Sequence, residues 1–238
     1  MIREHFEIKQ TAVTILSERE YIKTAKDAVF DARSQIESKI SQDPYFGTTY
    51  EPYRASPNDE CVVKRMCDAS VAADVGPMAA VAGAIAGYAV EKMKNAGAAY
   101  AVVDNGGDIA LICDREVHIG MYANVGGQRL SLKITPTDEI LGVCSSSASV
   151  GPSVSFGRSD ISTVISNDAA LADACATALG NLVKERSKMA EHLEFVCNIA
   201  GVNGCLAYCD GALAMCGDVP ELVRSDSKDE VITKILLA

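Results

Sequence analysis

The stretch AYAVVDNGGDIALIC, residues 99–113, joins two apolar runs through a short polar segment. Residues 99–103 predict a buried strand, and residues 109–113 predict a second extended run. The Asn-Gly-Gly-Asp segment between them, residues 105–108, predicts a turn, because Asn-Gly is the strongest short signal for a hairpin. Strands joined by so short a turn pair antiparallel, since a parallel pair needs a long crossover. This stretch therefore favours antiparallel or mixed sheets.

The rest of the chain predicts helices before this stretch, and strands followed by helices after it. The predicted helices are 18–41, 60–73, 77–95, 168–184 and 189–200. The segment 6–16 predicts one or two strands; the other predicted strands are 117–122, 129–134, 140–144 and 161–165, with a hairpin at 205–208 and 213–215. Because helices and strands do not alternate regularly, the fold class is α+β. No repeat or long linker divides the chain, so we expect one domain, residues 1–238, with sheets flanked by helices.

The composition is typical of a soluble globular protein, with 48% hydrophobic and 23% charged residues. The net charge of −10 argues against a nonspecific nucleic-acid binder, which needs clustered Lys and Arg. The most apolar run, residues 75–90, is shorter than the ~20 residues that a membrane span requires. The first ten residues lack the apolar core of a signal peptide, so we expect a cytoplasmic protein that binds neither nucleic acid nor membranes.

The nine cysteines are spread between Cys61 and Cys216, and none of them forms a CxxC pair. In a reducing cytosol they are expected to be free thiols. Because free cysteine commonly behaves as a small buried apolar residue, at least six of the nine are expected to serve in packing.

The turn that joins the two central strands is the first candidate site. Paired glycines at Gly106 and Gly107 allow positive φ angles, and free backbone N–H groups of such a turn can bind a phosphate. Asn105, Gly106, Gly107 and Asp108 are therefore candidate ligand-binding residues. A simple hairpin turn is the alternative interpretation, and the motif is not the GxGxxG pattern of dinucleotide-binding folds.

The second candidate lies in the predicted helix 168–184. Asp173 and Thr177 are four residues apart and share a helical face with Asn181. The segment 167–182 carries no Lys, Arg or Glu, which indicates a face that is at least partly buried. Because a buried carboxylate needs a partner and hard oxygen ligands suit Mg²⁺, Asp173 and Thr177 are candidate metal ligands. A polar stripe in modest contact with solvent is the alternative.

The third candidate is the serine-rich segment 144–160, which begins with a thiol at the end of a predicted strand. A thiol in a ligand pocket can act as a nucleophile or sulfur carrier when its pKa is lowered, so Cys144 is the candidate catalytic residue. A flexible surface loop is the alternative. The candidate ligand-binding residues of this segment are Ser145, Ser146, Ser147, Gly151, Ser153, Ser155 and Asp160.

These segments together resemble the ApbE-like superfamily and, more closely, its UPF0280 family. The resemblance rests on the runs GPMAAVAGAIA (76–86), DNGGDI (104–109), CSSSASVGPSVSFG (144–157) and LADACAT (171–177). It covers nearly the whole chain and implies the ApbE-like fold. The best-known superfamily members are flavin transferases that move FMN from FAD onto a protein threonine.

In those transferases, residues that match Asp173 and Thr177 help to hold Mg²⁺ beside the FAD pyrophosphate, and the matching glycine pair lies against the nucleotide. The resemblance therefore implies Mg²⁺ and FAD or FMN as cofactors. Two features differ: the transferase loop Thr-Ser-Gly-Asp-Tyr is Ser-Ser-Ser-Ala-Ser here, and the His-x-x-x-Pro-x-x-Gly segment has no counterpart, because no histidine lies between His118 and His192.

The resemblance to UPF0280 also implies a link with sulfide assimilation into homocysteine in anaerobes. Our leading hypothesis from the sequence is therefore a sulfur-transfer protein with a sulfur-pathway partner, in which Cys144 carries a persulfide. One alternative is a divergent Mg²⁺-dependent flavin transferase or flavin-nucleotide binder. Another is a non-catalytic assembly subunit whose helix 77–95 packs against a partner, and a homo-oligomer is also left open.

Overall fold

The structure is a computed structural model that describes residues 1–125, 128–147 and 159–224, with the side chains of 122–128 excepted. The helices are α1 (Arg19–Gln42), α2 (Cys61–Ala73), α3 (Val81–Asn95), α4 (Ala169–Leu182) and α5 (Met189–Cys197), with short 3-10 helices η1 (Pro44–Gly47), η2 (Pro77–Ala80) and η3 (Arg186–Lys188). The strands are β1 (Ile2–Ile8), β2 (Thr11–Ser17), β3 (Ala101–Asn105), β4 (Asp108–Cys113), β5 (Val117–Val125), β6 (Gln128–Ile134), β7 (Thr137–Ser146), β8 (Ile161–Ser166), β9 (Val202–Cys209), β10 (Ala212–Gly217) and β11 (Glu221–Arg224).

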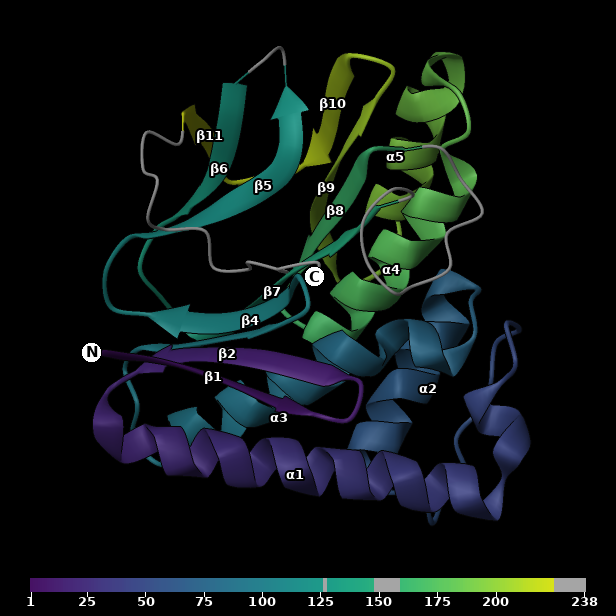
Figure 1. Cartoon of the computed structure of the whole chain (residues 1–238). Coiled ribbons are helices and arrows are strands. Elements are labelled where there is room, and N and C mark those ends of the chain that lie inside the picture. The colour runs from purple at the N-terminus through teal and green to yellow at the C-terminus, as the bar shows by residue number, and fades with distance from the viewer. Residues whose placement is uncertain (126–127, 148–158, 225–238) are drawn as a thin grey trace.

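Two sheets and a helical layer make up the fold. The larger sheet has the strand order β1-β2-β3-β4-β7-β8-β9-β10, and the smaller sheet has the order β11-β6-β5. Each strand pair in the described part of the chain is antiparallel. The helices lie along the lower and right-hand sides of Figure 1, and the smaller sheet lies at its upper left. This arrangement confirms the predicted α+β class.

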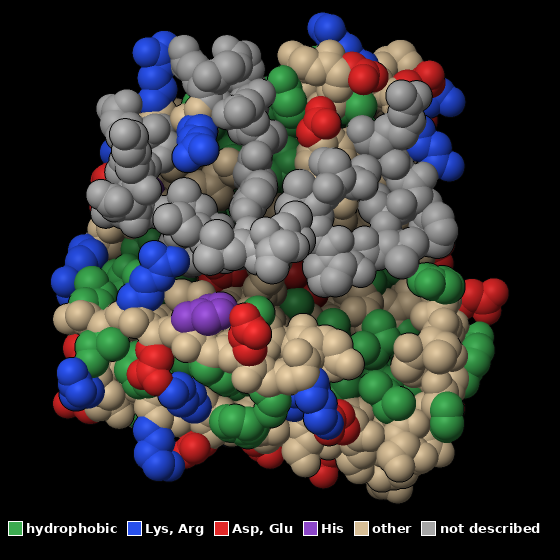
Figure 2. Space-filling view, in the orientation of Figure 1, with side chains coloured by type: hydrophobic (Ala, Val, Ile, Leu, Met, Phe, Trp, Pro, Cys, Tyr) green, Lys and Arg blue, Asp and Glu red, His purple; other side chains and the backbone are tan. Residues whose placement is uncertain are grey.

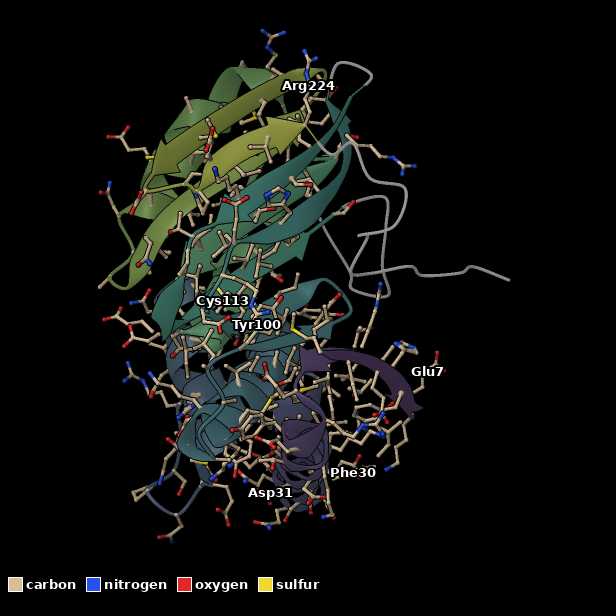
Figure 3. All side chains as sticks on the ribbon, turned by 90° about the vertical axis from the view of Figure 1, so that its left-hand side faces the viewer. Glu7, Phe30, Asp31, Tyr100, Cys113 and Arg224 are labelled. Atoms are coloured by element: carbon tan, nitrogen blue, oxygen red, sulfur yellow. The ribbon has the colours of Figure 1, made fainter. Side chains whose placement is uncertain are left out.

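Side-chain alternation along the central strands separates two hydrophobic cores. On β4, Ala110 and Ile112 face the core beneath the helices, whereas Ile109 and Leu111 face the core beneath the smaller sheet. The paired strand β3 is buried along its whole length. Tyr100 and Cys113, both labelled in Figure 3, belong to the second core. Burial on both faces explains why these strands read as continuous apolar runs in the sequence.

Small residues allow α4 to begin in close contact with both α3 and β7. A Cβ atom added to Gly83 of α3 would lie 2.1 Å from the carbonyl oxygen of Ala169, and one added to Gly142 of β7 would lie 2.5 Å from the Ala169 Cα. Neither position has room for a side chain. The contact of Gly83 with Ala169 shows how closely helix 77–95 packs within the fold.

Most of the predicted elements are confirmed, although β1 begins four residues before the predicted segment and the short helices η1 and η3 were not predicted. Strand β11 was not predicted, because its four residues gain their partner from β6, which is distant in sequence. The predicted helix 77–95 begins as the 3-10 helix η2 before continuing as α3.

The outer surface mixes charges of both signs. Figure 2 shows Lys and Arg side chains interspersed with Asp and Glu over the lower half of one face, where α1 and the β1–β2 hairpin lie. In the described part of the chain, no single helix has both the length and the apolarity needed to cross a membrane; α2 taken together with Pro77–Asn95 meets that test only as a pair bent by 108°.

Candidate functional site

The predicted turn positions two carboxylates at the junction of β3 and β4. Gly106 and Gly107 have φ angles of +71° and +105°, which few residues other than glycine adopt. The Asp104 Oδ1 atom accepts a hydrogen bond of 2.9 Å from the Gly107 N–H and so fixes the turn. Asp108 follows as the first residue of β4. The prediction of a turn is confirmed, and both of its flanking aspartates lie at the site.

A third carboxylate comes from α4 and contacts the start of α3. The Asp173 Oδ2 atom accepts a hydrogen bond of 2.8 Å from the Gly83 N–H, and the Ala82 N–H also donates to this carboxylate. The N-cap residue of α3, Ala80, has no side-chain hydrogen bond of its own. Asp173 therefore supplies the acceptor that the first turn of α3 lacks.

Strand β3 is tied to the same helix start. The Asn105 side-chain nitrogen donates a hydrogen bond of 3.2 Å to the Ala82 carbonyl oxygen. Ala82 directly precedes Gly83, which donates to Asp173, so the end of β3 and residue Asp173 of α4 meet at the same place on α3. The predicted ligand-binding residue Asn105 thus has a clear structural role.

Burial and neighbouring charge raise the proton affinity of the Asp108 carboxylate, and burial raises that of Asp173. Burial raises the pKa of Asp108 well above its usual value, and the charges of Asp173 and Asp104 raise it further. Burial also raises the pKa of Asp173 to about 7, although the Gly83 N–H opposes the shift. The buried Oδ1 atom of Asp108 has no hydrogen-bond partner among the described residues. Such a cluster favours a proton or a cation.

Cys144 faces this cluster from the neighbouring strand. Asp108 and Cys144 are directly paired across β4 and β7. The Cys144 side chain is fully buried, and its thiol donates a hydrogen bond of 3.4 Å to the Ala169 carbonyl. Burial raises the pKa of this thiol well above its usual value, and the charges of Asp108 and Asp173 add to the effect. The structure therefore places this thiol inside the core, and its catalytic role stays a prediction.

The sequence comparisons identify the family. The protein-family model described as "AbpE bacteria" matches residues 2–199. A UPF0280 protein of Methanothrix thermoacetophila is 49% identical over 98% of this chain and 100% of the relative, and one of Methanocella arvoryzae is 46% identical over 96% of this chain and 94% of the relative.

The chain belongs to the UPF0280 family. Solved structures share the fold of this UPF0280 chain at low sequence identity. A mutant of the flavin transferase ApbE from Vibrio cholerae aligns with a TM-score of 0.60 and 15% identity, covering 92% of this chain and 98% of that one. The apo form of the Pseudomonas stutzeri flavinyl transferase ApbE aligns with a TM-score of 0.61 and 11% identity, covering 90% and 94%. These similarities confirm the ApbE-like fold.

The remaining predicted site residues differ in burial and in their hydrogen-bond partners. Gly106 is exposed, and Thr177 lies one helical turn beyond Asp173 and is partly exposed. The Ser145 backbone N–H donates to the Asp108 carboxylate, whereas its hydroxyl shares a hydrogen bond of 2.8 Å with Thr163.

The later part of the serine-rich segment contributes less to the described site. Ser146 is buried, and the Ser147 hydroxyl donates a hydrogen bond of 2.7 Å to the backbone carbonyl of Asp160. Asp160 itself is exposed. Gly151, Ser153 and Ser155 lie outside the described residues.

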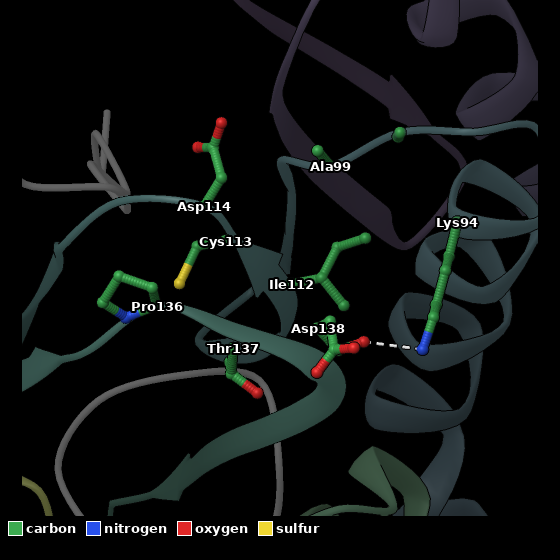
Figure 4. Close-up of a pocket in the computed structure, with 9 residues that line it drawn as sticks. Lys94, Ala99, Ile112, Cys113, Asp114, Pro136, Thr137 and Asp138 are labelled. Carbon is green, nitrogen blue, oxygen red and sulfur yellow. Dashed lines mark hydrogen bonds between the residues drawn. The ribbon is translucent and has the colours of Figure 1, made fainter.

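A cavity of about 370 Å³ lies away from this cluster, at the end of β4 opposite to Asp108. Ile112, Cys113 and Thr137 are among its lining residues, and Lys94 donates a hydrogen bond of 2.6 Å to the Asp138 carbonyl across it (Figure 4). It includes none of the predicted site residues of the UPF0280 chain. In particular, Gly106, Cys144, Asp173 and Thr177 do not line this cavity.

Sequence reasoning missed three participants of the site. Asp104 was quoted within the turn motif, but its role was not predicted; an aspartate followed by a turn glycine is a signal for such a hydrogen bond. The Gly83 N–H and the Ala169 carbonyl are backbone groups, and only the pairing of elements that are distant in sequence brings them here.

Proposed function

We propose that this UPF0280 protein binds a flavin dinucleotide together with Mg²⁺ at the Asp108–Asp173 cluster and uses it as an FMN donor. The observation that carries this proposal is the buried Asp108 Oδ1 atom, which lacks a hydrogen-bond partner among the described residues and lies close to two further carboxylates. The solved proteins with the same fold that are named flavin transferases support the choice of ligand.

The donor set fits Mg²⁺, which binds oxygen and is commonly held by one or two carboxylates, with phosphates and water as its other ligands. Within the described ranges, no three His, Cys, Asp or Glu side chains are arranged to hold a metal ion. A site that uses Asp108, Asp173 and the Thr177 hydroxyl, and leaves other positions to phosphate, agrees with that finding. Bound there, Mg²⁺ would neutralise the charge of the pyrophosphate.

The charge of the cluster makes the cation a requirement for nucleotide binding. A pyrophosphate brought near Asp104, Asp108 and Asp173 meets carboxylates of the same sign, and the protein as a whole carries a charge of −10. Binding of FAD is therefore expected to depend on Mg²⁺. A neutral ligand would show no such dependence.

The glycine turn supplies room beside the carboxylates. A Cβ atom added to Gly106 or Gly107 would have no heavy atom within 4 Å, so a ligand can approach the backbone of the turn. Next to it, Asp104 holds the Gly107 N–H. In this proposal the turn lies against the nucleotide, and Asp108 and Asp173 hold the cation.

The sulfur-transfer hypothesis is not carried forward. Persulfide chemistry needs an accessible thiolate and a leaving thiol. The Cys144 thiol is fully buried, and this burial raises its pKa; the negative charges of Asp108 and Asp173 raise the pKa further.

Equilibrium dialysis of FAD with and without Mg²⁺ tests the proposal. We expect saturable binding that is lost when the cation is chelated and weakened at least about tenfold by Asp173→Asn, since a lost charged ligand is commonly worth more than 1.4 kcal/mol. Asp138→Asn is the matched control, because this exposed carboxylate lies at the other end of β4. An FAD affinity that changes neither on chelation of Mg²⁺ nor in Asp173→Asn would contradict the proposal.

The transfer step needs its own assay, because the chain lacks the histidine segment of the transferases. Transfer of FMN from FAD to a protein releases AMP, which chromatography detects. We expect AMP release in the presence of Mg²⁺ and an acceptor protein that contains threonine. FAD binding without AMP release would retain the binding site and reject the transfer.

A further inference from the structure

Three thiols meet where α5 ends beside the β9–β10 hairpin. Cys197 is the last residue of α5, and Cys205 and Cys216 are directly paired across β9 and β10. The Cys197 thiol is hydrogen-bonded to the thiols of both Cys205 and Cys216. A Cβ atom added to Gly217 would lie 2.6 Å from the Cys197 sulfur, so the end of α5 packs tightly on the end of β10.

The three thiols differ in their exposure. Cys205 is fully buried and donates a hydrogen bond of 3.3 Å to the Leu193 carbonyl. Burial raises its pKa to about 12, which disfavours its thiolate. Cys197 and Cys216 are partly exposed, so a dissolved reagent can reach them. Burial raises the pKa of Cys197 as well, so it is their accessibility that makes Cys197 and Cys216 the reactive members of the cluster.

The local backbone allows the small movement that bond formation needs. Cys197 ends a helix, and Cys216 is followed by Gly217 with a φ angle of +76°. Ends of elements adjust more easily than their interiors. The three thiols do not form a metal-binding arrangement, as judged over the residues that the structure describes. Their contact is better suited to sulfur–sulfur chemistry.

We propose that Cys197 and Cys216 form a thiol–disulfide exchange site that a low-molecular-weight disulfide oxidises to an intramolecular disulfide. One thiolate attacks a sulfur of the small disulfide, forms a mixed disulfide and releases one small thiolate, which takes up a proton. The second cysteine thiolate then attacks the protein sulfur of the mixed disulfide and releases the other small thiol. The protein dithiol loses two electrons and two protons, and the small disulfide becomes two thiols.

The new bond fastens α5 to β10, the last strand of the larger sheet in the described part of the chain. It closes a loop of about twenty residues, which restricts the unfolded chain. We expect the oxidised protein to unfold at a Tm higher by on the order of 5–10 °C. A reductant such as dithiothreitol reverses the rise.

The test treats the full chain with oxidised glutathione, alkylates the remaining thiols with N-ethylmaleimide under denaturing conditions, and maps the peptides by mass spectrometry. We expect two fewer N-ethylmaleimide adducts than in the reduced protein and a linked peptide pair that contains Cys197 and Cys216. The Cys216→Ser variant is expected to keep one glutathione on Cys197 and to form no link.

Cys61→Ser is the matched control, because Cys61 is exposed and lies on α2. It is expected to form the same link as the unchanged protein. A link between Cys205 and Cys216 would overturn the proposal. So would oxidation that adds glutathione to Cys61 while Cys197 and Cys216 both remain alkylated.

Discussion

The Asp173 carboxylate accepts a hydrogen bond of 2.8 Å from the Gly83 N–H, although the two residues lie 90 positions apart in the sequence. One side chain thereby satisfies the start of α3 and adds charge to the Asp108 cluster. In the proposed function, stability and ligand binding share this residue, and suitable substitutions separate the two roles.

The hydrogen-bonding role of Asp173 is tested by comparing two substitutions. Asp173→Asn keeps an oxygen that accepts from Gly83, whereas Asp173→Ala removes it. We expect the Ala variant to have a free energy of unfolding about 1 kcal/mol lower than the Asn variant, as for loss of a helix cap. Urea denaturation at one pH measures the difference, and equal stabilities would contradict the capping role.

The charge of Asp173 predicts a pH dependence of stability in metal-free buffer. Its pKa of about 7 in the folded protein exceeds the unfolded value of roughly 3.9, so the folded state binds more protons between these values. Stability from this group is fully present below about pH 4 and is lost as the pH rises through about 7. The free energy of unfolding, measured relative to Asp173→Asn, should therefore fall across this range; a constant difference would refute the raised pKa.

The close contact between α3 and α4 predicts unequal effects of two glycine substitutions. Gly83→Ala places its methyl group 2.1 Å from the Ala169 carbonyl oxygen and should lower the free energy of unfolding by roughly 1–3 kcal/mol. Gly87→Ala, whose Cβ would lie 3.3 Å from the Ala169 side chain, is the control. Its better helix propensity, worth about 1 kcal/mol, should offset most of the strain. Thermal or urea unfolding of both variants makes the comparison.

The role of the glycine turn is tested with a matched pair of substitutions. Gly106 and Gly211 have φ angles of +71° and +76°, and neither has a heavy atom within 4 Å of an added Cβ. Replacing either residue with Ala should cost about 1 kcal/mol of stability through backbone strain. Only Gly106→Ala is expected to weaken Mg²⁺-dependent FAD binding. An equal loss of binding in both variants would remove the turn from the site.

The sequence predicted the elements of the site better than their contacts. The spacing of Asp173 and Thr177 placed both on one face of a helix, and the absence of long charged residues around them indicated burial, which Asp173 confirms. Local spacing carries this information because a helix repeats every 3.6 residues. The role of Thr177 as a metal ligand stays a prediction.

Cys144 shows where sequence reasoning stops. Its position at the end of a strand was predicted within two residues. The side of the sheet toward which its thiol points, however, depends on the pairing of β7 with β4 and on where α4 packs against the sheet. Those contacts join segments far apart in the chain, and no local pattern encodes them. Strand β11 was missed for the same reason, because its partner β6 is also distant in sequence.

The pairing of β4 with β7 has a consequence for the order of folding. The chain between β4 and β7 contains the β5–β6 hairpin. Local contacts can form this hairpin before β4 and β7 pair with each other. Contacts between distant segments form slowly, because the intervening loop loses entropy before the contact is made. We therefore expect Asp108, Cys144 and Asp173 to come together late in refolding. If the proposed Mg²⁺-dependent ligand binding holds, its recovery after dilution from denaturant should lag behind recovery of helical circular dichroism, so that binding would report the final step of folding.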